Sequence, residues 1–319
     1  MKNISIASLA VIGLALTGSV ASAEELWDPH LRGVDEGLAA GATPPPGVYG
    51  VLNNYWAGYD KYDSSGHKAA NGEKLDALVE VPIILWVPGW NVLGADYSAA
   101  IAQPFDYTNL KGLSAAGVGA NNAHWGTFNT VVIPGQLSWA LPNDFHVKTG
   151  LTVYLDDASS SFSHLPANKG VGSGNGFWTV QPDLGVSWLH DGWNLSMDAH
   201  YAYNFADNHY HNLISGADEG TYKSGAELAI DYTAAKTIGK WTFGIGAHQE
   251  NQLVSDSGAA AAAEGCGAAK GCKAVNYGAG PLLGYQFESV SIMGEYNHNI
   301  YAQNDVAGQI FNVRLVAPF

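Results

Sequence analysis

The residues best suited to acid–base chemistry are His248 and Glu250, in the stretch GAHQEN at residues 246–251. On a β-strand, residues two positions apart share a face and lie roughly 6.5–7 Å apart, close enough to join one hydrogen-bonded network. Catalysis by such a pair, as in lipid-modifying enzymes, would also need a nucleophile with an orienting partner. No serine motif of that kind accompanies the pair. We therefore expect no enzymatic activity and assign no catalytic residues.

Two other polar stretches suggest metal binding but supply few ligands. His209 and His211 lie in the stretch NHYHN, but two histidines alone on a long loop more often form a solvated polar tip. Asp156 and Asp157 open another long loop and carry the oxygen ligands that calcium prefers, although too few such ligands are defined. We therefore expect neither a metal site nor a cofactor.

The two cysteines, Cys266 and Cys272, flank five residues in a stretch rich in Gly and Ala. In an exported protein this spacing favours a local disulfide. A metal or redox role would need further ligands or a Cys-x-x-Cys motif, which the sequence does not have.

The first 23 residues have the features of a secretory signal peptide. Lys2 precedes an apolar run from Ile4 to Leu16, and the small-residue triplet Ala21-Ser22-Ala23 follows. A membrane anchor is the alternative, but the run is shorter than the roughly 20 residues that a bilayer span needs. We predict a signal peptide over residues 1–23 and export of the chain.

The composition excludes one class of partner. The chain carries 14 Lys and Arg against 29 Asp and Glu, a formal net charge of −15, whereas recognition of nucleic acid needs a basic face. Charged residues make up 13% of the chain, about half the usual share for a soluble domain. Few charges together with many glycines and aromatic residues indicate an all-β protein that is not an ordinary water-soluble one.

After Pro46 the sequence alternates between apolar and polar residues, in segments of about 10 to 16 residues separated by turn signals. The last segment, FNVRLVAPF at residues 311–319, places Phe311, Val313 and Leu315 on one face and Asn312 and Arg314 on the other. A soluble β-sandwich alternates in the same way, so further features must separate the two classes.

Three features favour a membrane barrel over a secreted sandwich. The strands are longer than the five or six residues or so that are typical of soluble proteins. Short and long connections alternate along the chain, with tight turns near residues 88–91, 142–144, 190–192, 237–240 and 288–289, and long loops at 62–76, 109–126, 158–176, 207–224 and 257–273. Aromatic residues gather where the strands meet the tight turns, as in the girdle at a bilayer interface: Trp139, Phe145, Trp188, Trp193, Trp241, Phe287 and Phe319.

These features predict a transmembrane antiparallel β-barrel over residues 47–319. Counting segments gives about twelve strands, with ten or fourteen as alternatives. Closure of the sheet leaves no unpaired edge in lipid. We therefore expect a multi-pass protein of the bacterial cell outer membrane, surrounded by its lipid, with short periplasmic turns and long extracellular loops.

Residues 24–46, here called the lead, precede the first strand and end in three prolines. They cannot form a barrel strand. Two alternatives remain open, a disordered periplasmic lead and a segment folded into the lumen. Leu31, Val34 and Leu38 have helical spacing, which is weak evidence for a short helix.

The polar parity of the strands predicts which residues face the lumen, where they would line a pore or bind solute. These residues are Glu80, Asp96, Lys148, Asp183, Asp198, His200, Glu227, Asp231, His248, Glu250, Glu295, Asn297, Asn312 and Arg314. Two roles are open for them. Pairs such as Arg314 with Glu295 could hold the wall together, or the acidic excess could select neutral or cationic solutes.

One stretch carries a family resemblance. The run GVDEGLAAGATPPPGVYGVLNNYWAGYDKY, with the entry PPGVY at residues 45–49, resembles the opening of the outer-membrane family named for the MetA pathway of phenol degradation. The stretch WNVLGA at residues 90–95 is similar to the second turn of that family. The resemblance implies a barrel of the twelve-stranded type and a role in passing aromatic or other hydrophobic compounds. The Cys-bracketed loop at 258–272 departs from the family pattern. A terminal Phe also resembles the signal read by the barrel-assembly machinery, which would then be a partner during biogenesis.

These inferences together predict a porin-like channel for passive uptake of small hydrophobic or aromatic compounds. The alternative is a structural or surface-interaction barrel with a plugged lumen, whose extracellular loops bind a partner. The Cys-stapled loop and the aromatic and His-rich loop at 207–222 favour that alternative.

Overall fold

The computed structural model describes residues 27–69, 72–111, 124–159, 174–211, 217–263, 266 and 272–319. The expected signal peptide, residues 1–23, lies outside the described residues, as do the first residues of the lead. Among the described residues, no helix is both long enough and apolar enough to cross a membrane.

Strands make up most of the chain. In chain order they are β1 (Gly47–Tyr62), β2 (Lys74–Val87), β3 (Asn91–Val92), β4 (Ala95–Ala102), β5 (Phe105–Lys111), β6 (His124–Thr127), β7 (Val131–Ala140), β8 (Phe145–Tyr154), β9 (Thr179–His190), β10 (Trp193–Asn204), β11 (Asp207–His211), β12 (Asp218–Tyr222), β13 (Glu227–Ile238), β14 (Trp241–Gln252), β15 (Val275–Gln286), β16 (Ser291–Gln303) and β17 (Asp305–Pro318). A 3₁₀ turn at Pro142–Asp144 and the short helix α1 (Ala259–Ala263) complete the elements.

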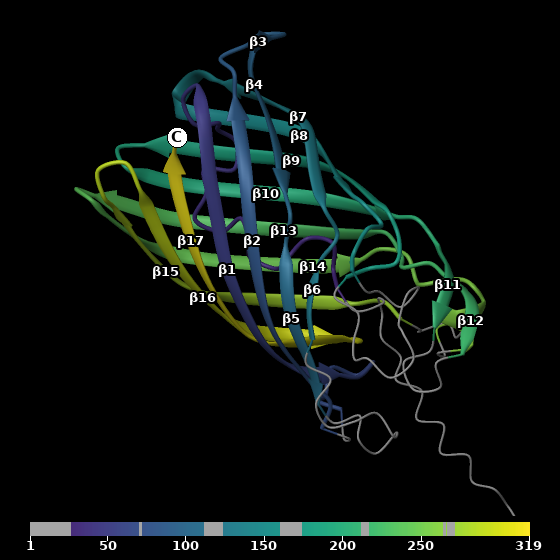
Figure 1. The fold of residues 1–319 in the computed structure, drawn as a ribbon. Helices are drawn as coiled ribbons and strands as arrows, with labels where there is room; N and C mark the ends of the chain where they lie inside the picture. The colour runs from purple at the N-terminus through teal and green to yellow at the C-terminus, as the bar shows by residue number, and fades with distance from the viewer. Residues whose placement is uncertain are drawn as a thin grey trace, which may run out of the picture.

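The strands form a closed antiparallel barrel, as the sequence predicted (Figure 1). The last strand, β17, pairs with β1 from Tyr49 opposite Pro318 to Tyr62 opposite Asp305. On its other edge β1 pairs with β2, which pairs with both β4 and β5. β4 and β5 are two parts of one barrel strand, and β6 and β7 are two parts of the next. Without the short β3 and the separate β11–β12 hairpin, the barrel therefore has twelve transmembrane strands.

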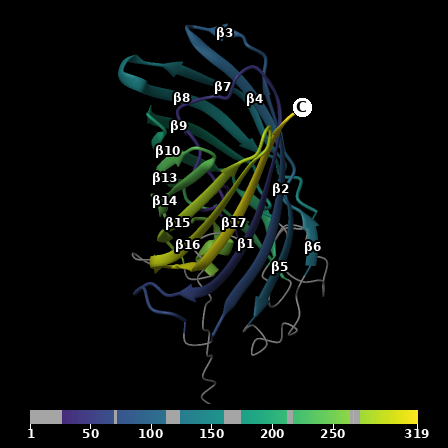
Figure 2. The same ribbon diagram turned by 90° about the vertical axis from the view of Figure 1, so that its left-hand side faces the viewer.

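The two ends of the barrel differ as expected (Figures 1 and 2). The tight turns and the C-terminus lie at one end, and the β9–β10 turn there consists of Asp191 and Gly192, both at positive φ. At the other end, β11 and β12 form a separate hairpin within the loop between β10 and β13. The expected disulfide joins Cys266 to Cys272 at this end, with a Cα–Cα distance of 5.1 Å.

A second apolar cluster forms outside the barrel around this hairpin. Tyr210 of β11 stacks on Tyr222 of β12 with ring centroids 4.9 Å apart. The same buried cluster contains Ala260 and Ala261 of α1 and the two cysteines of the disulfide. We call this unit (β11, β12, α1 and the disulfide) the loop cap.

Five of the seven aromatic residues predicted to form a girdle are exposed on the outer face of the strands, whereas Trp139 and Trp188 are half-buried; the girdle itself stays a prediction. Phe145, Trp193, Trp241 and Phe287 are 43–48% exposed, and Phe319 is 86% exposed. All of them lie next to the tight turns. Phe319 covers Gly50 of β1, because a Cβ at that glycine would lie 2.8 Å from the phenylalanine ring.

The predicted inward facing of Glu80 is wrong. On β2 the side chains of Val79 and Val81 are buried inside the barrel, whereas Ile84 and Trp86 are exposed on its outer face. Glu80 therefore points outward. Alternation could not assign this strand because the run VPIILWV at residues 81–87 is apolar on both faces, and the inner wall is itself apolar in this sector.

Candidate functional site

The described part of the lead, residues 27–46, lies inside the ring of strands (Figure 2). It runs as successive turns instead of the short helix considered above. Val34 N donates to Leu31 O (3.0 Å), and Glu36 N donates to Gly33 O (3.2 Å). Gly33 and Gly37 adopt positive φ, a conformation that glycine reaches without steric cost. Turns of this kind leave many backbone groups unpaired within the segment, and the barrel wall binds them.

Asp231 of β13 is one of the wall residues that bind the lead. Its carboxylate accepts hydrogen bonds from the backbone N–H of Gly33 (3.1 Å) and of Asp35 (2.9 Å). The Nε2 atom of His30 lies 3.2 Å from the same carboxylate. Asp231 is 3% exposed, and a buried carboxylate requires such partners.

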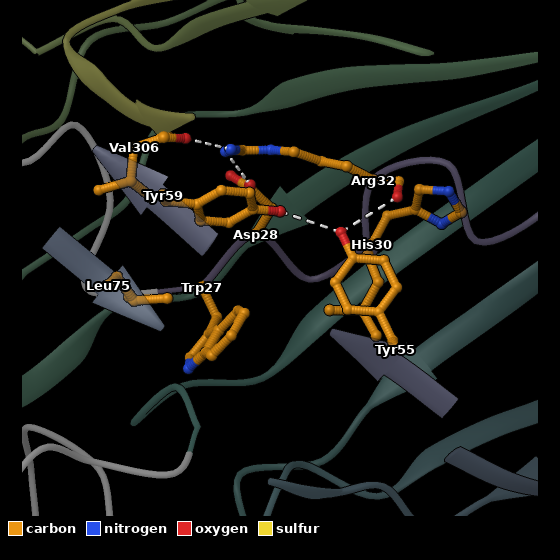
Figure 3. Close-up of a pocket in the computed structure, with 9 residues that line it drawn as sticks. Trp27, Asp28, His30, Arg32, Tyr55, Tyr59, Leu75 and Val306 are labelled. Carbon is orange, nitrogen blue, oxygen red and sulfur yellow. Dashed lines mark hydrogen bonds and ion pairs between the residues drawn. The ribbon is translucent and has the colours of Figure 1, made fainter. Parts of the chain in front are cut away.

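Arg32 of the lead forms a second attachment (Figure 3). Its guanidinium group binds Glu250 of β14, Asp28 of the lead and the carbonyl of Val306. It also lies 2.9 Å from Asp305 at the start of β17. Arg32 thus connects the lead to two strands, β14 and β17, that are distant from it in sequence. The carboxylates of Glu250, Asp28 and Asp305 compensate its charge.

Arg314 and Glu36 form the third attachment. Arg314 of β17 donates to the carbonyls of Val34 and Glu36, the latter at 2.8 Å. The carboxylate of Glu36 accepts from Asn297 of β16 at 2.8 Å. Arg314 also pairs with Glu295 at 3.1 Å, as the sequence suggested.

Toward the tight-turn end the backbone of the lead touches the wall directly. Gly41 N donates to Ser187 Oγ (2.7 Å), and its carbonyl accepts from Ser138 Oγ (2.8 Å). A Cβ on Gly185 would lie 2.2 Å from Ala40 O, and a Cβ on Gly246 would lie 1.8 Å from a carboxylate oxygen of Glu36. Glycine at these two wall positions is what allows the lead to fit.

Part of the inner wall, on β1 and β2, is apolar. Tyr55, Leu75 and Val79 of β1 and β2 are buried against Trp27 and Leu31 of the lead. The interior therefore has an apolar sector on β1 and β2 and a polar sector from β9 to β17. Between lead and apolar sector is a cavity of about 10 Å³, lined by Trp27, Asp28, His30, Leu31, Arg32, Tyr55, Tyr59, Leu75 and Val306. That volume holds about one water molecule, too small for an organic solute.

The structure brings most of the predicted lumen residues together on the inner wall. Buried there are Asp183, Asp198, His200, Glu227, Asp231, His248, Glu250, Glu295, Asn297, Asn312 and Arg314. Lys148 is half-buried, directly opposite Ser138, on the same inner face. Asp96 shares that face but is exposed at the tight-turn rim, and Glu80 points outward as described.

The residues considered above for catalysis or metal binding contact other groups. His248 lies 3.5 Å from Glu36 and 3.3 Å from Asn276, while Glu250 binds Arg32, so both residues contact the lead or the wall. His209 lies 3.3 Å from Asp218 on the exposed hairpin. Both carboxylate oxygens of Asp157 accept from Thr130, at 2.8 and 2.7 Å.

Sequence reasoning missed the functional residues of the lead, namely His30, Arg32, Asp35 and Glu36. The acidic excess of the predicted inner wall was the available signal, because buried carboxylates need cations or donors. Arg32 and the N–H groups of the lead supply some of them. Alternation could not find these residues, since the lead has no strand parity.

Comparisons with known proteins agree with this geometry. Residues 60–315 match the model of the family described as "Putative MetA-pathway of phenol degradation". The crystal structure of an outer membrane channel from Pseudomonas putida F1 is similar over 88% of this chain and 98% of that chain, with a TM-score of 0.72 and 13% identity. The translocator domain of the autotransporter NalP from Neisseria meningitidis is similar over 88% and 91%, with a TM-score of 0.50 and 8% identity.

No curated protein sequence matches the chain. At 13% and 8% identity the two structures establish only the fold. The family match covers most of the chain, so the chain belongs to that family. The chain is a multi-pass β-barrel of the bacterial outer membrane.

Proposed function

Because the chain belongs to the family described as "Putative MetA-pathway of phenol degradation", we propose that it is a channel for passive uptake of small hydrophobic or aromatic compounds. In this proposal the lead closes the bore and moves when solute passes. The observation that carries the proposal is the apolar sector of the inner wall, where Trp27 and Leu31 of the lead pack on β1 and β2.

A hydrophobic solute can compete for this sector. Burial of apolar surface contributes about 25 cal/mol per Å² whichever molecule supplies the surface. A small aromatic compound that binds Tyr55 and Leu75 therefore replaces contacts that Trp27 now makes. The contacts across the polar sector are hydrogen bonds and ion pairs, which water can substitute as the lead shifts. Passage thus requires displacement of a non-covalently held segment and no source of energy.

Uptake by intact cells tests this proposal. Phenol and lactose would be compared in cells that lack other porins, with and without this protein, since outer-membrane lipopolysaccharide slows direct diffusion. We expect the protein to accelerate phenol uptake and to leave lactose uptake nearly unchanged. Absence of both solute flux and conductance in purified, folded protein would overturn the channel assignment.

A partner-binding barrel is the second candidate function, and two observations favour it. The lumen is filled by the lead, and the loop cap has its own buried cluster in which Tyr210 stacks on Tyr222. An ordered external unit of this kind can present a surface to another molecule. Replacing residues 205–225 and 254–273 with short Gly/Ser turns separates the candidates: lost surface adhesion with unchanged phenol uptake supports partner binding.

A further inference from the structure

The described residues contain three groups of side chains spaced for a metal ion. Asp256 lies with Cys266 and Cys272, but those two cysteines are joined in a disulfide. Asp28 lies with Glu227 and Glu250, but Arg32 binds two of these carboxylates. The third group consists of His30 and Asp35 of the lead and His200 of β10.

The third group has closely spaced ligand atoms. One ring nitrogen of each histidine and one carboxylate oxygen of Asp35 all lie within 4.8 Å of one another. Nε2 of His200 is 3.4 Å from Asp35 and 3.6 Å from Asp198 Oδ1. Both distances exceed the roughly 2.7–2.9 Å of a charge-assisted hydrogen bond.

Two of these atoms are buried without a hydrogen-bond partner. Nε2 of His200 and Oδ1 of Asp198 make no hydrogen bond. Both residues are buried, since His200 is 8% exposed and Asp198 is 4% exposed. Buried polar atoms in folded proteins nearly always have partners, and exceptions call for an unseen water or ion. The two atoms lie 3.6 Å apart, and Asp35 lies 3.4 Å from the same Nε2 atom.

The surroundings favour a cation over water alone. Asp35, Asp198 and Asp231 surround the imidazole rings of His30 and His200. The two rings are stacked with centroids 4.1 Å apart, so one ring must rotate for both to direct a nitrogen at the same ion. A divalent ion would offset the mutual repulsion of three carboxylates. Nε2 of His30 already lies 3.2 Å from Asp231, the type of contact with which proteins orient ligand imidazoles.

We propose that His30, Asp35 and His200, with Asp198 as a further oxygen ligand, bind one divalent transition-metal ion that ties the lead to the barrel wall. Two imidazoles with carboxylates suit Zn²⁺ and its neighbours in the first row, and exclude the all-oxygen environment preferred by Ca²⁺ and Mg²⁺. Since two ligands come from the lead and two from β10, the ion fastens the lead inside the bore. This inference does not depend on which solute the barrel passes.

The sequence did not predict this site because its ligands belong to unrelated patterns. His30 and Asp35 lie in a segment without periodicity, about 165 residues before Asp198 and His200 on a barrel strand. Only the fold of the lead into the lumen brings them together.

Metal titration of the full-length mature protein, refolded in detergent and stripped with EDTA, tests the proposal. Co²⁺ serves as the spectroscopic probe and Zn²⁺ as the competitor. We expect one Co²⁺ per chain, visible absorption from the bound ion, its loss on addition of Zn²⁺, and a thermal midpoint that rises with Zn²⁺ concentration.

Matched histidine variants assign the site. His30→Ala and His200→Ala should each weaken Co²⁺ binding at least tenfold, and Asp231→Asn should weaken it by about 10- to 100-fold through the orientation of His30. His248→Ala is the control, because His248 is also buried on the inner wall and also contacts the lead. His190→Ala controls for exposed histidines.

The shift in gel mobility between heated and unheated samples would establish that each variant is a folded barrel. If His200→Ala does not fold, His30→Ala carries the test, since His30 lies outside the strands. The proposal is overturned if wild-type protein binds no Co²⁺, or if folded His30→Ala binds it as tightly as His248→Ala does.

Discussion

Arg314 and Glu295 face each other across strands β17 and β16 inside the barrel, with a guanidinium nitrogen 3.1 Å from a carboxylate oxygen. Both side chains are nearly inaccessible to water. The same guanidinium binds two backbone carbonyls of the lead. The pair therefore joins neighbouring strands, which is one of the two roles that the sequence left open, and it also fixes the lead in the lumen.

Replacing Arg314 with Leu should destabilise the folded barrel by about 3–5 kcal/mol, since Glu295 would remain buried without its cation. The measurement is the free energy of unfolding in urea, in liposomes. The double variant Arg314→Leu/Glu295→Leu is the control, and we expect it to recover much of the loss. Equal destabilisation by single and double variants would contradict this account.

Replacing Leu315 with Arg should act through the membrane instead of the lumen. Leu315 shares the outer face with Phe311, which is 47% exposed. A cation on the lipid face costs about 2–4 kcal/mol at the bilayer midplane and less near the interface. Folding yield into liposomes measures the effect. If Leu315→Arg inserted normally while Arg314→Leu blocked insertion, the facing of β17 would be reversed.

A bulkier residue at Gly185 should displace the lead. A Cβ there would lie 2.2 Å from the carbonyl of Ala40, and backbone cannot yield as a flexible side chain does. We expect Gly185→Val to raise single-channel conductance in planar bilayers. Gly294→Val is the matched control, because the nearest atom to a Cβ at Gly294 is 3.9 Å away. Equal conductance of the two variants would argue that the lead does not limit flow.

Much of the fold could be predicted because lipid on one side and a polar interior on the other impose strict alternation. The parity of Phe311 and Arg314 was enough to place β17. Prediction failed at Glu80 because both faces of β2 are apolar. The inner face of β2 belongs to the apolar sector that packs against Trp27, so the strand has no polar side to mark the lumen. The sequence left the lead undecided between periplasm and lumen, because its position depends on contacts such as Gly33 with Asp231, which no local pattern encodes.

The loop cap should respond to pH through Asp256, which precedes α1 in the chain and accepts a hydrogen bond from Tyr222 of β12. Burial raises the pKa of this carboxyl to about 7, although it accepts from Tyr222 (2.6 Å) and from Gly225 N (2.8 Å). The folded cap therefore holds its proton more tightly than the unfolded cap does. Its stability should be greatest near pH 4 and should fall as the pH rises toward 7, by about 1.4 kcal/mol for each unit of pKa difference.

Hydrogen exchange of peptides from residues 205–275, corrected for intrinsic rates, measures this dependence between pH 5 and pH 8. In Asp256→Asn the protection should become nearly independent of pH, because the titrating group is gone. A cap whose protection increases with pH in the wild-type protein would contradict the assigned direction.

The central claim is that the lead closes the bore and must move for solute to pass, and a reversible lock tests it most directly. A Cβ on Gly246 would lie 3.0 Å from Cγ of Glu36, about the separation between Cβ of one cysteine and Sγ of the other in a disulfide. The double variant Glu36→Cys/Gly246→Cys, with Cys266 and Cys272 replaced by Ser, should therefore form a single bond between lead and wall.

Phenol uptake by cells carrying this variant is the decisive measurement, with the Glu36→Cys single variant as control. We predict that the oxidised double variant takes up phenol no faster than cells without the protein, and that a reductant restores the rate of the single variant. Uptake by the locked protein at the rate of the single variant would contradict the claim.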